Sequence, residues 1–433
     1  MAKFVVIDPT LRGVGQHHFE YDVHVLSAAE RNGWQAMLAA HRDFDAVGGR
    51  TGNWQIHRAF GDDRHRPVLH KLRQSQRRLA AATADGGSLS LARQCEAQIN
   101  GWRYGRRHDR ATRGYRAALD ATWTACQPTP GDQIFVPTVT PADLVGLADW
   151  APRNRAACKV DWHLQFHFPL VDAATWYARE SRKYDDQLLD LPDALADLLA
   201  ALPRDRVHLY ATTRSLADQF GYCLGESFTV LPIPVNSQIA ACRAAIAEKA
   251  PLRAICAGQA RSEKGASQWG QIVEGLKDDY FARGRLQVAL QAASEEELPA
   301  PLRRLSAEFG MAVAAPQANG PIALAGWPLG PREYVEYLAS ADIGLLTYDP
   351  LAYHYRISGV MVELLGAGVP VVVPAGCALA DELAESIFAY QQQLREHIPV
   401  VANHSTAELD WRAARPHGAR PGISVGSDAT GAK

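Results

Sequence analysis

The 433-residue sequence has no long hydrophobic run, and no stretch approaches the roughly 18–20 uninterrupted apolar residues of a membrane span. Its first ten residues, MAKFVVIDPT, contain one Lys and a short apolar run, which predicts a first β-strand and argues against a signal peptide. The formal net charge is only -2. This balance excludes a generally basic nucleic-acid-binding protein and a strongly acidic binder. We therefore expect a cytoplasmic protein with no nucleic-acid partner.

Cysteine is sparse: the seven residues are scattered and show no C-x-x-C spacing. An odd number of dispersed cysteines indicates reduced thiols and argues against a cysteine metal site. Hydrophobic residues (47%) and charged residues (21%) occur as in folded globular proteins, which excludes wholesale disorder. At about 150 residues per domain, the length predicts two or three domains.

The first half alternates short apolar runs with longer amphipathic stretches, the pattern of β-α units in a parallel sheet. A strand over residues 3–8 precedes a glycine loop at 12–15 and a helix from Phe19 to about Asn32. Further strands are predicted at 35–40, 134–137, 159–168, 207–211 and 229–233.

A second alternating series follows the segment Pro232-Ile-Pro-Val-Asn236, which marks a domain boundary. Its strands are predicted at 252–257, 286–292, 311–315, 322–326, 342–347 and 370–373, with helices notably at 332–340 and 360–367. The sequence thus predicts an α/β protein with two doubly wound, Rossmann-like domains, residues 1–235 and 236–411, facing a cleft. Residues 412–433 are predicted to be a flexible tail, and ligands are expected at the carboxyl ends of the strands.

Residues from about 58 to 118 interrupt the first series with many arginines and few carboxylates. Helical spacing and the breaker Asp85-Gly-Gly-Ser88 predict two helices inserted into the first domain. Two interpretations stay open: a solvated helical face, or a surface for an anionic membrane leaflet or a phosphorylated acceptor. The second interpretation would place the protein peripherally on the inner membrane face.

The segment from Tyr353 to Val373 carries the most specific chemical signal. Ser358 and Gly359 end a loop and open a helix, whose free N–H groups suit a phosphate. Glu363 follows about one turn later, within reach of a ribose or sugar diol. An ordinary helix with a solvated glutamate is the alternative.

A second loop, Ala257-Gly-Gln-Ala-Arg-Ser-Glu-Lys-Gly265, follows a predicted strand directly. Arg261 and Lys264 on this loop can neutralise a diphosphate leaving group without a metal ion. Two ordinary surface cations near a turn are the alternative.

With these two motifs, most of the chain resembles a retaining nucleotide-sugar glycosyltransferase of GT-B fold, of the large group called family 4. The resemblance also rests on the strand–glycine loop–helix at the N-terminus, the hinge Leu231-Pro-Ile-Pro-Val235 and the text Ala339-Ser-Ala-Asp-Ile-Gly-Leu-Leu346. It implies a hexosyltransferase-like enzyme of polysaccharide or glycoconjugate assembly. The donor would be a UDP- or GDP-sugar, a substrate rather than a cofactor, and no metal or other cofactor is implied. The acceptor, a glycan, lipid or small molecule, stays open.

The resemblance also implies roles for individual residues. Arg261 and Lys264 would hold the departing diphosphate, and Glu363 the ribose of the nucleotide. The helix-opening amides of Ser358, Gly359 and Val360 would hold phosphate as well. Gly13 and Gly15 would lie by the donor phosphate. His167, at the end of a strand, matches a cleft histidine of many GT-B enzymes, and a hydrogen-bonded core histidine is the alternative.

The sequence departs from the family pattern at two places. Counting back from Glu363 in the family's Glu-x7-Glu pair puts Tyr355 where the first Glu is expected, so contacts to the donor sugar must differ. The neighbouring Arg356 could pair with phosphate instead. The expected Gly-Arg dipeptide is Gly258-Gln259, which leaves Arg261 as the partner of Lys264.

Other interpretations are weaker. His17 and His18 have no third ligand at metal-binding spacing, and Asp43-Phe-Asp45 lacks the context of the metal motif that it imitates. A sugar-nucleotide epimerase or hydrolase would need a carboxylate pair, which the sequence does not reveal. A non-catalytic nucleotide-sugar binder remains the other alternative. A dinucleotide-dependent dehydrogenase is disfavoured because Gly13-x-Gly15 lacks a third glycine.

Overall fold

The computed structural model describes residues 1–14, 17–45, 52–61, 112–173, 191–244, 251–298, 302–304, 311–313, 321–327 and 329–397, with a few single residues between them. Residues 1–384 form one compact unit and Glu385 begins a second, of which only the end of one helix is described. The predicted tail and most of the predicted arginine-rich insertion lie outside the described residues.

The first half of the chain builds a sheet of seven parallel strands in the order β3-β2-β1-β4-β5-β6-β7. Its strands are β1 (Lys3–Asp8), β2 (Gln35–His41), β3 (Gln55–Phe60), β4 (Gln133–Val136), β5 (Asp161–Phe166), β6 (Val207–Ala211) and β7 (Thr229–Val230). The predicted strands are confirmed, although β7 is shorter than expected. Strand β3 was not predicted, because its residues fall at the start of the arginine-rich segment and alternate only weakly.

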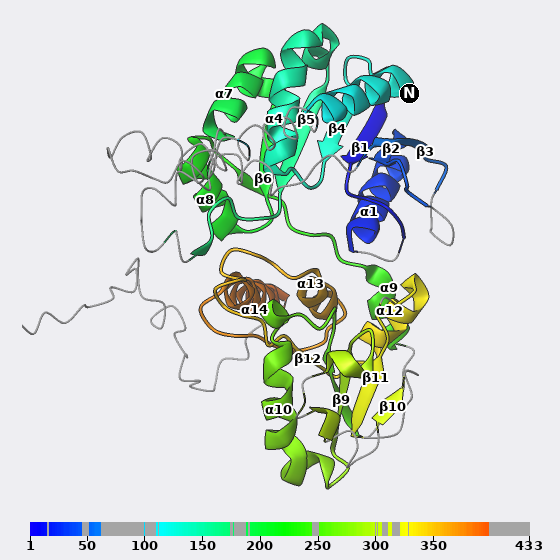
Figure 1. Cartoon of the computed structure of the whole chain (residues 1–433), viewed down its shortest axis with the longest axis vertical. Helices are drawn as coiled ribbons and strands as arrows, with labels where there is room; N and C mark the ends of the chain where they lie inside the picture. The colour runs from blue at the N-terminus through cyan, green and yellow to red at the C-terminus, as the bar shows by residue number, and fades with distance from the viewer. Residues whose placement is uncertain are drawn as a thin grey trace, which may run out of the picture. The chain divides into compact units, whose positions relative to one another are not determined.

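Helices cover both faces of this sheet (Figure 1). They are α1 (His17–Arg31), α4 (Pro141–Trp150), α7 (Leu191–Ala201) and α8 (Arg214–Leu224), and residues 112–126 are also helical. Thr140 begins α4 with a capping box to Asp143, and Pro141 fits the first turn because it needs no N–H partner there.

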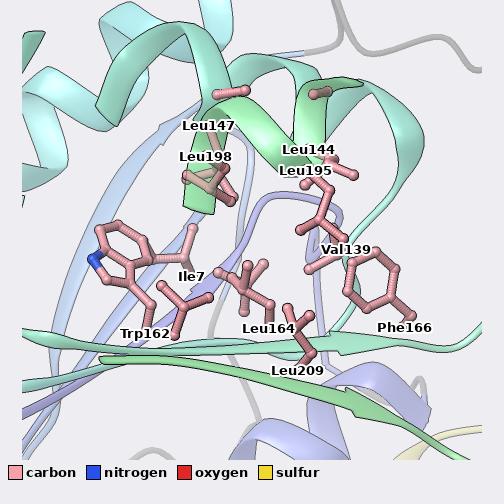
Figure 2. Packing of buried hydrophobic residues seen from close by; sticks show 14 of the residues in the cluster. Ile7, Val139, Leu144, Leu147, Trp162, Leu164, Phe166, Leu195, Leu198 and Leu209 are labelled. Atoms are coloured by element: carbon pink, nitrogen blue, oxygen red, sulfur yellow. The ribbon is translucent and has the colours of Figure 1, made fainter. Parts of the chain in front are cut away.

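Alternate residues of the strands fill two cores, as the two-residue period of a buried strand requires. On one face, Ile7, Trp162 and Leu164 pack under α4 and α7 (Figure 2). On the other, Val6 and Leu38 pack under Leu26 of α1. The sheet is thereby fixed on both sides, and the ends of its strands are held in place.

The second half builds another parallel sheet, in the order β10-β11-β9-β8-β12-β13. Its strands are β8 (Leu252–Cys256), β9 (Leu286–Gln291), β10 (Met311–Val313), β11 (Ile322–Ala325), β12 (Ile343–Leu345) and β13 (Val371–Val372). Its α-helices are α9 (Ser237–Ala244), α10 (Trp269–Leu276), α12 (Pro331–Ala339), α13 (Gly359–Gly366) and α14 (Ala378–His397). Short turns of 3-10 helix include Ser262–Lys264 and Ala266–Gln268. The predicted class, two parallel α/β sheets with Rossmann-like order, is confirmed.

Candidate functional site

A cavity of about 340 Å³ lies inside the unit formed by residues 1–384. Its lining comes from the segments that follow the strands of both sheets, for example Thr138 after β4, His167 after β5 and Gly258 after β8. This is where parallel α/β sheets place their ligands. The cavity therefore has two walls, one from each half of the chain.

Three cations gather on the second-half wall. Arg261, Lys264 and Arg356 all line the cavity, and the two arginines are close enough to Lys264 to act on its charge. Burial lowers the pKa of Lys264 to about 8, with both arginines lowering it and Glu263 raising it. Arg356 lies 4.9 Å from the centroid of the Tyr353 ring, which supports its planar guanidinium. Clustered cations repel one another, and a bound anion would relieve this repulsion, so the cluster favours an anionic ligand.

Glycine is required at two positions of the basic loop. Gly258 has φ +99°, and a Cβ there would collide with Nζ of Lys264. Gly265 has φ +75°, and a Cβ there would collide with the carbonyl oxygen of Thr347. Both backbone conformations are strained for L side chains. The glycines let the loop fold back tightly, and that fold places Lys264 at the cavity.

Helix α13 begins at the cavity. Ser358 is its N-cap, with Oγ accepting from the amide of Met361 at 3.4 Å, and the Tyr348 hydroxyl lies 3.3 Å from the same oxygen. Gly359 and Val360 follow on the cavity lining. The first amides of a helix have no partners within it and carry a partial positive charge. An anion at this end would face both the cations and these amides.

Glu363, one turn further along α13, is 5% exposed and accepts a 2.6 Å hydrogen bond from the Tyr334 hydroxyl. Burial raises the pKa of the Glu363 carboxyl to about 7; the Tyr334 hydrogen bond lowers it and the Glu20 carboxylate raises it. Burial also raises the pKa of Tyr334 well above its ordinary value, so this hydroxyl stays a donor. A buried carboxylate at a cavity is suited to accept hydrogen bonds from ligand hydroxyl groups.

His167 lies on the first-half wall, directly after β5. One ring nitrogen bonds the Pro137 carbonyl, and the buried Nε2 has no partner in the described part of the chain. Burial lowers the pKa of His167 to about 3, and nearby His18 lowers it further, whereas the bond to Pro137 raises it. The imidazole is therefore neutral near pH 7 and presents Nε2 as an acceptor. It can bind a hydroxyl group but cannot act as a general acid there.

A buried carboxyl pair on the same wall was missed by the sequence analysis. Asp8, the last residue of β1, is 1% exposed, and Asp22 of α1 is 0% exposed; both line the cavity. Burial and the adjacent Asp8 raise the pKa of Asp22 well above its ordinary value. An aspartate at a buried position of an amphipathic helix was the available signal.

The structure brings eight of the ten predicted site residues to this cavity: His167, Arg261, Lys264, Arg356, Ser358, Gly359, Val360 and Glu363. Gly13 pairs with Asp45 in an isolated bridge and does not line the cavity, and a Cβ at Gly13 would meet nothing within 4 Å. Gly15 lies outside the described residues.

Tyr355, at the position of the missing first glutamate, does not line the cavity. Its ring is 6% exposed and belongs to the hydrophobic core of the first half, edge-on to Trp176. Its carbonyl accepts from Thr213 Oγ1 at 3.4 Å. This position therefore joins the two halves of the chain and offers no side chain to the cavity.

No group of three or more His, Cys, Asp or Glu residues within the described ranges has a geometry that could hold a metal ion. In the same part of the chain, no helix is long and apolar enough to cross a bilayer.

Comparison with solved structures finds the same two-sheet fold. The trehalose-6-phosphate synthase OtsA matches with a TM-score of 0.53 at 13% identity, over 92% of this chain and 92% of that chain. An E. coli structure named as trehalose-6-phosphate bound with UDP-2-fluoro glucose matches with a TM-score of 0.51 at 14% identity, over 88% of this chain and 86% of that chain. The N-terminal domain of a Candida albicans trehalose-6-phosphate phosphatase gives a TM-score of 0.50 at 14% identity, over 89% of both.

These likenesses establish the GT-B fold, since identities this low carry information on the fold alone. They do not support the narrower assignment to family 4. No family model matches the sequence, and no curated protein matches it. The function must therefore be argued from the cavity.

Proposed function

We propose that this protein is a glycosyltransferase that moves a sugar from a nucleoside diphosphate to an acceptor hydroxyl group with retention of configuration. The observation that carries the proposal is the second-half wall of the cavity. Within one cavity it combines three cations, the amino end of α13 and the buried Glu363. A diphosphate fits the cations and the helix terminus, and the adjacent ribose diol fits the carboxylate.

The donor would lie along this wall. Lys264, Arg261 and Arg356 would neutralise the diphosphate, and the amides of Gly359 and Val360 would complete its hydrogen bonds. Trp327, which lines the cavity after β11 and is 37% exposed, offers a flat surface for the nucleobase. His167 would accept a hydrogen bond from a hydroxyl of the donor sugar through Nε2.

In the reaction, the acceptor oxygen forms a bond to the anomeric carbon while the bond from that carbon to the phosphate oxygen breaks. The nucleoside diphosphate leaves with the electron pair, and the acceptor proton passes to the departing phosphate oxygen. The cations stabilise the negative charge that develops on the leaving group. This route needs no protein carboxylate as nucleophile and no metal ion.

The carboxyl pair Asp8 and Asp22 is the one observation that favours hydrolysis or epimerisation instead. Glycoside hydrolysis uses two carboxyl groups about 5 Å or more apart on opposite sides of the scissile bond. Asp8 and Asp22 are close enough for Asp8 to raise the pKa of Asp22, and both lie on the same wall. They cannot flank a substrate bond, so transfer is the better-supported reaction. A nucleotide-sugar binder without turnover remains the competing class.

Calorimetric titration with UDP, GDP and ADP tests the donor site, followed by the matching nucleotide sugars. We expect one nucleotide to bind, and Lys264→Ala, Arg356→Ala and Glu363→Gln each to weaken its binding about tenfold. Arg332→Ala is the matched control, because Arg332 is 91% exposed on α12 and does not line the cavity. Unchanged affinity in all three site variants would refute the donor site. If a nucleotide sugar binds but no nucleoside diphosphate is released in any acceptor mixture, the protein would instead be a nucleotide-sugar binder without turnover.

A further inference from the structure

The first-half wall of the cavity contains buried acidic oxygens that donor binding leaves unexplained. Oδ2 of Asp8 and both carboxyl oxygens of Asp22 have no hydrogen-bond partner in the described chain other than each other. Both residues are at least 99% buried, and both line the cavity. Buried polar atoms in folded proteins nearly always have partners. Buried polar atoms without partners beside a cavity indicate that a bound ligand supplies the missing hydrogen bonds.

The charges on the two walls have opposite signs. The cations Arg261, Lys264 and Arg356 belong to the second half of the chain. Among the described first-half residues that line the cavity there is no Lys or Arg, whereas three carboxyl groups lie there, those of Asp8, Glu20 and Asp22. An anionic ligand group against the first-half wall would therefore meet negative charge.

We propose that Asp8 and Asp22 form the acceptor-binding site and select an uncharged, hydroxyl-rich acceptor over a phosphorylated one. This inference rests on the proposed function, since it assigns the acceptor of the same reaction. A carboxyl pair that shares one proton offers one O–H donor and several acceptor oxygens, which complement neighbouring hydroxyl groups of a sugar or polyol.

The same pair disfavours phosphate esters. A phosphate charge about 6 Å from the carboxylate, at an effective dielectric constant of about 20, would lose affinity on the order of a hundredfold. The neighbouring His18 lies 4.0 Å from Asp8 Oδ2 and offsets this charge only when it is protonated.

Variants separate the hydrogen bonding of the pair from its charge. Asp22→Ala removes the polar atoms and should raise the KM for the acceptor at least tenfold, while Asp22→Asn keeps a donor and an acceptor and should restore KM to within about threefold. Asp8→Asn removes the remaining charge and should reduce discrimination against phosphate esters by on the order of a hundredfold. Asp43→Asn is the matched control, because Asp43 is 62% exposed and lies outside the cavity.

The assay uses the full chain, the glucose conjugate of the nucleotide that binds best, and two matched acceptor pools. One pool holds glucose, mannose, glycerol and myo-inositol, and the other holds a monophosphate ester of each. Products are identified by mass spectrometry, and nucleotide affinity is measured in parallel for every variant. We expect transfer to a neutral acceptor, with kcat/KM at least tenfold above that of its phosphate ester.

Three results would overturn the inference: preferential transfer to a phosphate ester, no product in either pool from a protein that binds the donor, or an unaltered KM in Asp22→Ala. Failure of the proposed function looks different, because then no nucleotide or nucleotide sugar binds at all. A change in nucleotide affinity in Asp22→Ala would place Asp22 at the donor and would also contradict the assignment.

Discussion

Replacing Glu363 by Gln should stabilise the free protein at alkaline pH while weakening nucleotide binding. The carboxyl group is 5% exposed and its pKa is raised from 4.5 to about 7, chiefly by burial. Gln has nearly the same shape, carries no charge and still accepts the hydrogen bond from Tyr334. The substitution therefore removes the cost of a buried charge without opening a cavity.

The sign and size of the effect follow from linkage. Between pH 4.5 and 7 the folded protein binds more protons at Glu363 than the unfolded chain does, so the free energy of unfolding falls as pH rises. The stabilisation is complete below pH 4.5 and is lost as pH rises through about 7. At about 1.4 kcal/mol per pKa unit, the loss reaches about 3 kcal/mol at pH 8.5. Glu363→Gln should not show it.

Urea unfolding of both proteins at pH 5.5 and 8.5 measures this difference. We expect Glu363→Gln to be more stable by about 1.4 kcal/mol at pH 5.5 and by about 3 kcal/mol at pH 8.5. Glu336→Gln, on the outer face of α12, should stay within about 0.5 kcal/mol of the wild type at both pH values. A Glu363→Gln protein that is less stable at pH 8.5, or whose difference from the wild type does not depend on pH, would refute the reasoning.

Three further predictions concern the same half of the chain. Binding of the nucleoside diphosphate should raise the pKa of Lys264 from about 8, so the protein should take up protons on binding at pH 8.5. Calorimetric titrations of Glu363→Gln in buffers of different ionisation enthalpy measure this proton uptake. Adding Lys264→Met to the Glu363→Gln variant should abolish it. Gly265→Ala should cost about 3 kcal/mol of stability, because its positive φ and the carbonyl of Thr347 leave no room for a Cβ; a loss below about 1 kcal/mol in urea unfolding would contradict this. Tyr355→Ala should cost about 3 kcal/mol of stability by leaving a cavity in the first-half core. Nucleotide affinity, measured well below the unfolding temperature, should be unchanged. Weaker nucleotide binding would indicate that Tyr355 contributes to the donor site and would contradict this.

Much of the fold follows from the pattern of apolar residues. Both strand series were predicted because buried parallel strands are continuous apolar runs, a signal that each segment carries locally. Strand β3 escaped because half of its residues are polar and only Phe60 is fully buried. Its place in the sheet comes from pairing with β2, which is a property of the folded chain.

The residues of the second-half wall of the cavity could also be predicted from the sequence. Gly258, Arg261, Lys264, Ser358 and Glu363 occur within two short segments, and the physical need for glycine, cations and a helix terminus at a phosphate is local. The sequence did not determine the protonation state of these groups. The raised pKa of Glu363 and the lowered pKa of Lys264 depend on burial and on neighbours distant in the chain.

The sequence by itself determined the fold class, the two strand series and residues that line the second-half wall of the cavity, because helix and strand periods, glycine loops and helix caps act over a few residues. Only the tertiary structure decided that Tyr355 belongs to a core and not to the cavity. It also decided that Asp8 and Asp22, on different elements, lie next to each other on the first-half wall, where burial and Asp8 raise the pKa of Asp22. Contacts of this kind depend on how strands and helices pack in three dimensions, and burial, which sets the charge of each group, exists only after that packing.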